Sequence, residues 1–293
     1  MTNEGCMLCP RKCGADRSVS KGVCGASKDI RIARVGLHKW EEPCISYGNG
    51  SGTVFFSGCS LKCVFCQNAE ISRGFKGKNI TPDALAQEFI RLQDMGASNI
   101  NLVTPTHFVD DIICALDKAG DRLKIPVCYN CGGYESSETL ERLKGYVDIF
   151  MPDIKYYSSE SSKKYSSAPD YFEVASRAIK KMHEMVGYAD IDGEGHMRKG
   201  VLVRHLVLPS LFKDSIRLLE YLASEYDVKR LGISIMSQYF PTEGCADYPE
   251  INRKLTSLEY MKVVRRAKEL GFVNGFIQDK KSATAAYVPD FDY

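Results

Sequence analysis

The sequence predicts an α/β fold, because short runs of β-branched and apolar residues alternate with longer segments of helical periodicity from residue 53 onward. This alternation is typical of parallel strands that are connected by helices. Six strand–helix repeats can be counted, whereas a closed TIM barrel has eight. We therefore expect an open, partial (β/α)6 barrel of the TIM type over residues 53–293, preceded by a cysteine-rich extension over residues 1–52.

The first strand is expected over residues 53–57, where Thr-Val-Phe-Phe-Ser runs directly into Gly58-Cys59. A helix then starts at Thr81-Pro82-Asp83, since proline is favoured in the first turn of a helix, and it ends at Met95-Gly96. The later strands are expected over 100–103, 125–129, 147–151, 201–208 and 231–236, with a final strand over 272–276, and the later helices over 109–119, 137–144, 171–185, 213–224 and 258–270.

Two segments interrupt this pattern. Residues 1–52 combine cysteine, glycine and polar residues with little periodicity, so we expect them to be held in place by something other than an apolar core. Residues 186–199 are expected to form a turn between two elements, because they lack the ligand spacing of a calcium-binding loop.

Composition excludes few classes of partner. The formal net charge is +2, which gives no reason to expect nucleic acid or an anionic membrane as a partner. The first residues show no basic segment followed by an apolar run, and no stretch has the roughly 20 apolar residues that are needed to cross a bilayer. We therefore expect a cytoplasmic protein that has no membrane partner.

The cysteine content points to metal binding. The chain has 12 cysteines but no secretory signal, and in a large chain of this kind metal ligation is a better explanation than disulfide bonds. Seven of them fall into two groups before residue 67. These groups are Cys6, Cys9, Cys13 and Cys24, and then Cys59, Cys63 and Cys66.

The second group, Cys59-x3-Cys63-x2-Cys66, follows the first strand, at the end of the barrel where TIM-type folds build active sites. Three thiolates can bind three corners of a 4Fe-4S cube, and a fourth cysteine at matching spacing is missing. The fourth iron would then be open to a substrate or cofactor. A structural zinc site is a weaker alternative, because it requires four ligands.

This spacing resembles the defining motif of the radical S-adenosylmethionine (SAM) superfamily. The resemblance implies that the open iron binds the amino and carboxylate groups of SAM. An electron from the cluster would then split SAM into methionine and a 5'-deoxyadenosyl radical, which abstracts hydrogen from an unreactive carbon. It also implies an external electron donor such as flavodoxin or ferredoxin.

Further runs are similar to the branch that contains the pyruvate formate-lyase activating enzymes: Gly50–Gly58, Asn68, Tyr129-Asn130, Asp153-Ile-Lys155 and Val203-Arg204-His205. By this resemblance Phe65 packs near the adenine, and the polar residues at successive strand ends surround the ribose, the carboxylate and the substrate. Each polar residue also suits a structural role. Asn130 suits a turn, Asp153 and Lys155 suit a local ion pair, and Arg204 suits a sheet edge.

The chain also departs from the patterns of the superfamily. The Gly-Gly-Glu motif that commonly holds the amino group of SAM is replaced by Val103-Thr104-Pro105-Thr106-His107, whose polar groups would have to supply the acceptors. The Gly-x-Gly-x-Arg motif of glycyl-radical activases lacks its arginine at Gly48–Gly52. Thr104–His107 and Ser237–Pro241 resemble instead an uncharacterised subgroup of this branch. The residues expected to bind the cofactor are Phe65, Asn68, Thr104, Thr106, Asn130, Asp153, Lys155 and Arg204.

The substrate stays open at this point. Activation of a glycyl radical enzyme competes with direct modification of a metabolite, a peptide or RNA. An alternative of another class is a non-catalytic scaffold that binds zinc at Cys59, Cys63 and Cys66.

The N-terminal group, Cys6, Cys9, Cys13 and Cys24, supplies four ligands in a segment that is poor in apolar residues. We expect a second metal site there. It would hold either a zinc ion in a closed tetrahedral site or an auxiliary iron-sulfur cluster.

Overall fold

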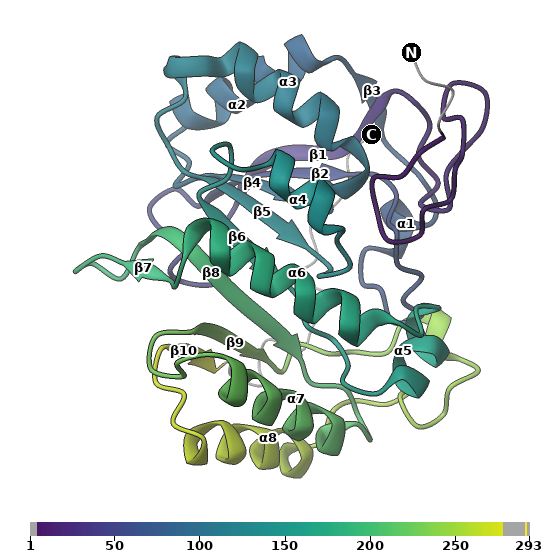
Figure 1. Ribbon diagram of the computed structural model, residues 1–293, viewed down its shortest axis with the longest axis vertical. Coiled ribbons are helices and arrows are strands. Elements are labelled where there is room, and N and C mark those ends of the chain that lie inside the picture. Colours follow the sequence, from purple (N-terminus) through teal and green to yellow (C-terminus); the bar gives the residue numbers. More distant parts are fainter. Residues whose placement is uncertain (1–4, 278–290, 292–293) are drawn as a thin grey trace.

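The computed structural model describes residues 5–277 and residue 291. Its main feature is a twisted sheet whose successive parallel strands are connected by helices (Figure 1). The sheet does not close on itself, because β3 and β10 form its two edges within the described residues. The prediction of an open, partial barrel is therefore confirmed. The parallel strands are, in spatial order, β2 (Ser51–Phe56), β4 (Ile100–Val103), β5 (Val127–Cys131), β6 (Ile149–Pro152), β8 (Met197–Leu206), β9 (Gly232–Met236) and β10 (Gly275–Ile277).

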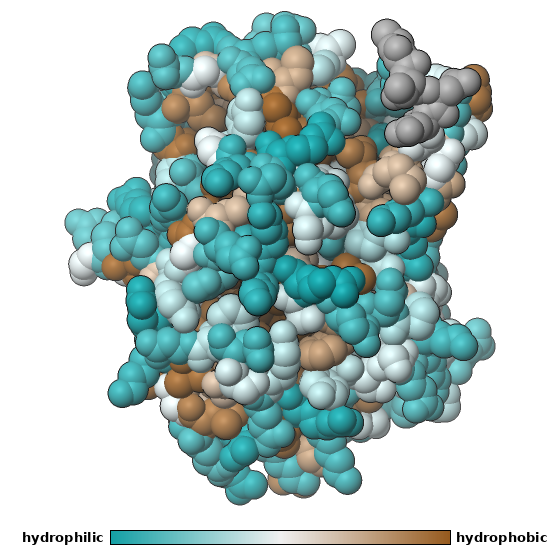
Figure 2. Space-filling model, viewed as in Figure 1, coloured by the Kyte–Doolittle hydropathy of each residue, from teal (hydrophilic) through white to brown (hydrophobic). Residues whose placement is uncertain are grey.

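The helices that connect these strands agree with the sequence pattern. The start of α2 is as predicted, since Pro82 is its first residue and the Thr81 side chain accepts a hydrogen bond of 3.2 Å from the Ala84 amide. The space-filling view shows that the outer surface over the helices is mainly hydrophilic (Figure 2). No helix in the described part of the chain is long and apolar enough to cross a membrane. The connecting helices are α2 (Pro82–Asp94), α3 (Val109–Ala119), α4 (Ser137–Arg142), α6 (Tyr171–Val186), α7 (Phe212–Glu225) and α8 (Ser257–Glu269).

Some elements lie where no element was predicted. The longest is β1 (Ile30–His38), which pairs antiparallel with both β2 and β3 and so adds a strand from the extension to the sheet. Its alternation of apolar and basic residues was the signal that sequence reasoning missed. The boundary at residue 52 between an extension and a barrel domain stays a prediction. The other additional elements are α1 (Ala69–Ser72), β3 (Lys78–Ile80), α5 (Ser159–Ser166) and β7 (Asp190–Ile191).

Side chains alternate between the two faces of the central strands, as the pleat of a strand requires. Tyr129 and Phe150 are fully buried in the large core that also contains the apolar faces of the helices. Their neighbours in sequence, Cys128 and Ile149, belong to a second, smaller core inside the barrel. Residues that continue the inner row toward the carboxyl ends of the strands therefore point into the barrel interior.

A segment of the extension, residues 41–46, closes the amino end of this interior, and we refer to it as the plug. Cys44 and Ile45 are fully buried in the inner core. The Met197 amide donates to the Cys44 carbonyl oxygen at 2.9 Å, so the plug is bound to the start of β8. The amide group of Asn99 donates to the Ile45 carbonyl oxygen at 2.7 Å and accepts from the Ser51 hydroxyl at 2.7 Å. These contacts place the residues before Cys44 inside the barrel.

We predict that Asn99→Ala lowers the free energy of unfolding by about 1–3 kcal/mol, because the buried Ser51 hydroxyl loses its acceptor. Urea denaturation of the two proteins measures this difference. Ser98→Ala is the matched control. Ser98 also donates to the Ile45 carbonyl oxygen at 2.7 Å, but Asn99 still satisfies that oxygen when the Ser98 hydroxyl is removed. A loss for Asn99→Ala no larger than that for Ser98→Ala would contradict the prediction.

Candidate active site

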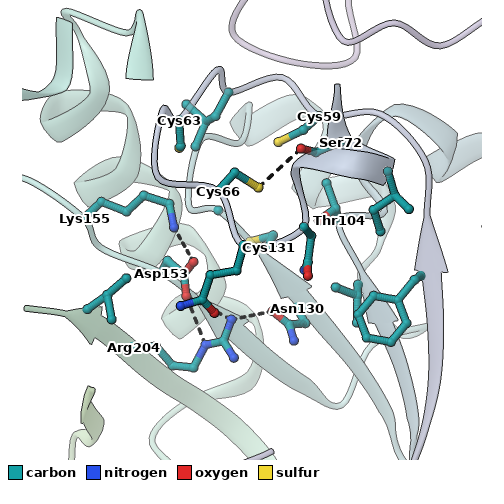
Figure 3. Close-up of a pocket in the computed structure, with 18 of the residues that line it drawn as sticks. Cys59, Cys63, Cys66, Ser72, Thr104, Asn130, Cys131, Asp153, Lys155 and Arg204 are labelled. Carbon is teal, nitrogen blue, oxygen red and sulfur yellow. Dashed lines mark hydrogen bonds and ion pairs between the residues drawn. The ribbon is translucent and has the colours of Figure 1, made fainter. Parts of the chain in front are cut away.

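A cavity of about 250 Å³ lies at the carboxyl ends of the parallel strands. Its walls come from the loop after β2 on one side and from the ends of β4, β5, β6, β8 and β9 on the other. Figure 3 shows the three thiols of that loop facing a group of charged side chains. This is the end of the barrel at which folds of this type assemble active sites.

The loop after β2, residues 58–68, carries Cys59, Cys63 and Cys66, and we refer to it as the cysteine loop. Gly58 has a φ of +96°, and a Cβ at this position would lie 2.7 Å from the Cys24 carbonyl oxygen, so the close approach requires glycine. The Cys59 amide donates to that same carbonyl oxygen at 3.1 Å.

The other side of the cysteine loop is bound to α5. The Val64 amide donates to the Tyr165 carbonyl oxygen at 2.8 Å, and the Ser166 hydroxyl donates to the Cys63 sulfur at 3.0 Å. Backbone and side-chain hydrogen bonds therefore hold the loop on both sides.

Two of the three thiols lie in a low-dielectric environment. Burial and the neighbouring thiols raise the pKa of Cys59 to about 12, and burial also raises the pKa of Cys63. Cys66 lies 3.3 Å from the Ser72 hydroxyl. Within the described residues, no three His, Cys, Asp or Glu side chains stand close enough to share a single metal ion.

Opposite the thiols, four predicted residues form one connected polar group. Arg204 donates to the Asn130 side-chain oxygen at 2.7 Å and to Asp153 at 3.0 Å, and Lys155 donates to the other oxygen of Asp153 at 2.5 Å (Figure 3). The side chains of Asp153, Lys155 and Arg204 are only 14–16% exposed. The parallel strands thus bring together residues that are far apart in the sequence.

Mutual pairing keeps these groups charged. Burial opposes the ionisation of Asp153, but Lys155 and Arg204 outweigh it and hold the pKa of this carboxyl below its ordinary value. Burial would lower the pKa of Lys155, but Asp153 and the Cys63 sulfur raise it overall. The site therefore presents two cations and one carboxylate next to the cysteine loop.

Sequence reasoning missed Glu41. The plug brings this residue to the polar group of Asn130, Asp153 and Arg204 from the amino end of the barrel. Its carboxylate lies 3.3 Å from Arg204 and accepts from Asn101 at 3.1 Å and Asn130 at 3.5 Å. Burial raises the pKa of Glu41, and Arg204 partly offsets this effect. No local motif marks this residue, because its role depends on a partner that lies 163 positions away.

The remaining predicted residues divide into two sets. Phe65, Asn68 and Thr104 line the cavity, and Thr104 has a φ of +57°, which is unusual for a β-branched residue. Thr106 does not line it, since its hydroxyl donates to the buried carboxyl of Glu135 at 2.8 Å. The position of Thr106 gives no support to a contact with the cofactor.

Glu135 is a second buried acid that sequence reasoning missed. It accepts hydrogen bonds from Thr106 and from the Tyr129 hydroxyl, the latter at 3.2 Å. Burial raises the pKa of Glu135 to about 7, although these donors partly stabilise its charged form.

Comparison with known proteins identifies the family. A model of the radical SAM superfamily matches residues 53–191. An uncharacterized protein of Methanocaldococcus jannaschii is 30% identical over 276 residues, which cover 91% of this chain and 75% of that one. The chain belongs to the radical SAM superfamily. Its cofactors are therefore a 4Fe-4S cluster and SAM, and its chemistry is radical SAM chemistry.

The chain is also 25% identical, over 245 residues, to the pyruvate formate-lyase-activating enzyme of Clostridium pasteurianum, and the match covers 79% of this chain and 94% of that enzyme. This relative is consistent with the branch that the sequence resembles.

Solved structures share the fold at low identity. A spore photoproduct lyase variant has a TM-score of 0.54 at 13% identity, over 83% of this chain and 79% of that one. The FeFe-hydrogenase maturase HydG of Carboxydothermus hydrogenoformans has a TM-score of 0.51 at 14% identity, over 75% of this chain. SuiB of Streptococcus suis has a TM-score of 0.50 at 15% identity, also over 75% of this chain. The matched region covers 50% of HydG and 46% of SuiB.

We predict that Glu135→Gln flattens the pH dependence of stability between about pH 4.5 and about pH 7. In this window the native carboxyl keeps its proton while the unfolded one releases it. The native state therefore binds more protons, and the free energy of unfolding falls as the pH rises. Urea denaturation across this range should show a smaller fall for the variant. The exposed Glu138→Gln on α4 is the control, and an equal fall in all three proteins would contradict the prediction.

Proposed function

We propose that this chain cleaves SAM reductively at a 4Fe-4S cluster bound by Cys59, Cys63 and Cys66, and abstracts hydrogen from a carbon of its substrate. The observation that carries the proposal is the cavity in which these three thiols face Asp153, Lys155 and Arg204. Family membership supports the chemistry, and the geometry of the cavity supports this assignment of residues.

The donor set fits the cluster. Three soft thiols on one loop, without a fourth cysteine on that loop, would hold three irons and leave one for SAM. When bound, the cluster supplies the electron that breaks a carbon–sulfur bond of SAM and releases the 5'-deoxyadenosyl radical. An external donor such as flavodoxin or ferredoxin would deliver that electron.

The charges in the cavity complement those of SAM, which carries a carboxylate, an ammonium and a sulfonium group. Lys155 and Arg204 would bind the carboxylate, and Asp153 would attract the cationic groups. Asn130 and Thr104 offer further polar groups at strand ends, and Thr104 lies where a Gly-Gly-Glu motif commonly stands. Phe65 and Asn68 line the cavity on the cysteine loop and would contact the nucleoside.

Two classes of target for the radical compete. The likeness to the pyruvate formate-lyase-activating enzyme supports a glycyl radical enzyme as the partner. The missing arginine at Gly48–Gly52 favours the competing class, in which a metabolite, a peptide or RNA is modified directly. Family membership argues against the remaining alternative, a non-catalytic zinc scaffold.

We predict that the anaerobically reconstituted chain, reduced with dithionite, converts SAM into methionine and 5'-deoxyadenosine. Cys63→Ala should reduce the release of 5'-deoxyadenosine to the background of a protein-free sample, because the cluster loses one of its three ligands. Chromatography with mass detection measures the product. Cys114→Ala is the matched control, since this half-buried cysteine lies on α3 outside the cavity.

Release of 5'-deoxyadenosine by Cys63→Ala at the rate of Cys114→Ala would refute the cluster assignment. The partner classes are separated by a second measurement. A glycine-centred radical on an added glycyl radical enzyme, detected by electron paramagnetic resonance, would support activation, and its absence there would favour direct modification.

We predict that Asp153→Asn raises the Kd for SAM by about 10-fold or more, because a hydrogen bond to a charged group contributes about 1.5–3 kcal/mol. Equilibrium binding to the reconstituted protein measures this effect, and iron analysis confirms that the cluster is intact. Asp214→Asn is the control. Asp214 is a partly buried acid that accepts hydrogen bonds from the Tyr157 and Ser158 amides outside the cavity. Equal weakening by both variants would show that Asp153 acts only through the fold.

A further inference from the structure

We propose that Cys6, Cys9, Cys13 and Cys24 form a second metal centre, a closed site of four thiolates that fastens residues 5–29 against the cysteine loop. We refer to residues 5–29 as the N-terminal segment. In Figure 1 its purple loops lie beside α1, at the carboxyl end of the barrel. The proposal concerns a site separate from the SAM cavity and does not depend on the proposed function.

The backbone of the N-terminal segment folds back on itself and gathers the thiols. The Cys6 amide donates to the Ala15 carbonyl oxygen at 2.9 Å, and the Gly14 amide donates to the Cys6 carbonyl oxygen at 3.1 Å. This pairing brings the backbone of Cys6 beside that of Cys13.

A second turn brings Cys24 to the same place. The Gly22 amide donates to the Ala26 carbonyl oxygen at 3.0 Å. A Cβ at Gly22 would lie 3.3 Å from the Cys24 sulfur and 3.6 Å from the Cys13 sulfur. Both sulfurs therefore lie next to Gly22, and a larger residue there would be tight against the Cys24 sulfur.

Backbone amides point at the sulfurs of three of these cysteines. In each case the donor lies two residues later in the chain: Arg11 for Cys9, Ala15 for Cys13 and Ala26 for Cys24. Hydrogen bonds of this kind orient metal ligands from outside the coordination shell.

The N-terminal segment is held mainly by hydrogen bonds, such as those that Arg11 and Arg17 donate to carbonyl oxygens of the barrel. It contains no helix or strand, and Met7, Val19 and Val23 are 46–84% exposed. Ordering a backbone costs about 1–2 kcal/mol per residue, and segments without a core commonly depend on a metal for their stability. In this structure the four thiols are not at the spacing of a single bound ion. Binding of a single ion would therefore require their side chains to rotate.

The position of the segment links such a centre to the cysteine loop. The Cys24 carbonyl oxygen accepts from the Cys59 amide, and Arg11 donates to the Ser60 carbonyl oxygen at 2.9 Å and to the Ser167 carbonyl oxygen at 2.6 Å. A metal that fixes Cys24 would thus fix the backbone next to Cys59. Four protein thiolates leave no open coordination position, so the centre would be structural or an electron relay.

The test uses the full chain with Cys59→Ala, Cys63→Ala and Cys66→Ala, which removes the cysteine-loop cluster and keeps all four N-terminal cysteines. The protein is purified anaerobically after expression with zinc and iron, and then reconstituted. Elemental analysis should find either about one zinc or about four irons with matching sulfide per chain. Both results support the site, and they distinguish a zinc ion from an auxiliary cluster.

Adding Cys9→Ser and Cys24→Ser to this triple variant should remove the remaining metal, whereas adding Cys114→Ser should leave it in place. A triple variant that holds neither zinc nor iron would overturn the proposal, and so would metal that survives Cys9→Ser with Cys24→Ser. In the otherwise native chain, Cys9→Ser with Cys24→Ser should also make residues 5–29 sensitive to limited proteolysis, and resistance equal to that of Cys114→Ser would count against the proposal.

Discussion

The buried ion pair between Arg204 and Asp153 is the interaction on which the arrangement of the site depends. Two charges removed from water are costly unless they are paired, and here each is held by further hydrogen bonds. The pair also lies where the backbones of β6 and β8 meet, since the Ile154 amide donates to the Arg204 carbonyl oxygen at 2.8 Å. The charge pattern of the cavity is thus part of the sheet itself.

The segment before residue 53 contributes to this site at two points. Cys24 contacts the backbone of the cysteine loop, and Glu41 reaches Arg204 from the plug. The segment therefore does more than extend the barrel, because it completes the floor of the cavity and supports the loop that carries the three thiols.

Much of the site could be predicted because its signals are local or periodic. The spacing of Cys59, Cys63 and Cys66 is local, and the placement of Asn130 and Asp153 follows from strands whose carboxyl ends share one edge. The residues at which strands begin and end could be predicted less precisely than the strands themselves. For example, β5 begins and ends two residues later than expected, since burial on both faces removes the alternation that marks a strand boundary. Thr106 was predicted as a cofactor contact because it lies in the run that replaces the Gly-Gly-Glu motif, and in the structure its hydroxyl donates to Glu135.

The sequence by itself determined the fold class, the family and the position of the cysteine loop, because each of these depends on residue types at short, regular spacing. Only the tertiary structure showed that Glu41 belongs to the site and that Arg204 pairs with Asp153. These contacts join residues that are 51 and 163 positions apart, and their geometry follows from how the strands and the plug pack. The spacing of Cys59, Cys63 and Cys66 identified the chemistry, and the packing around these cysteines decided which side chains face them.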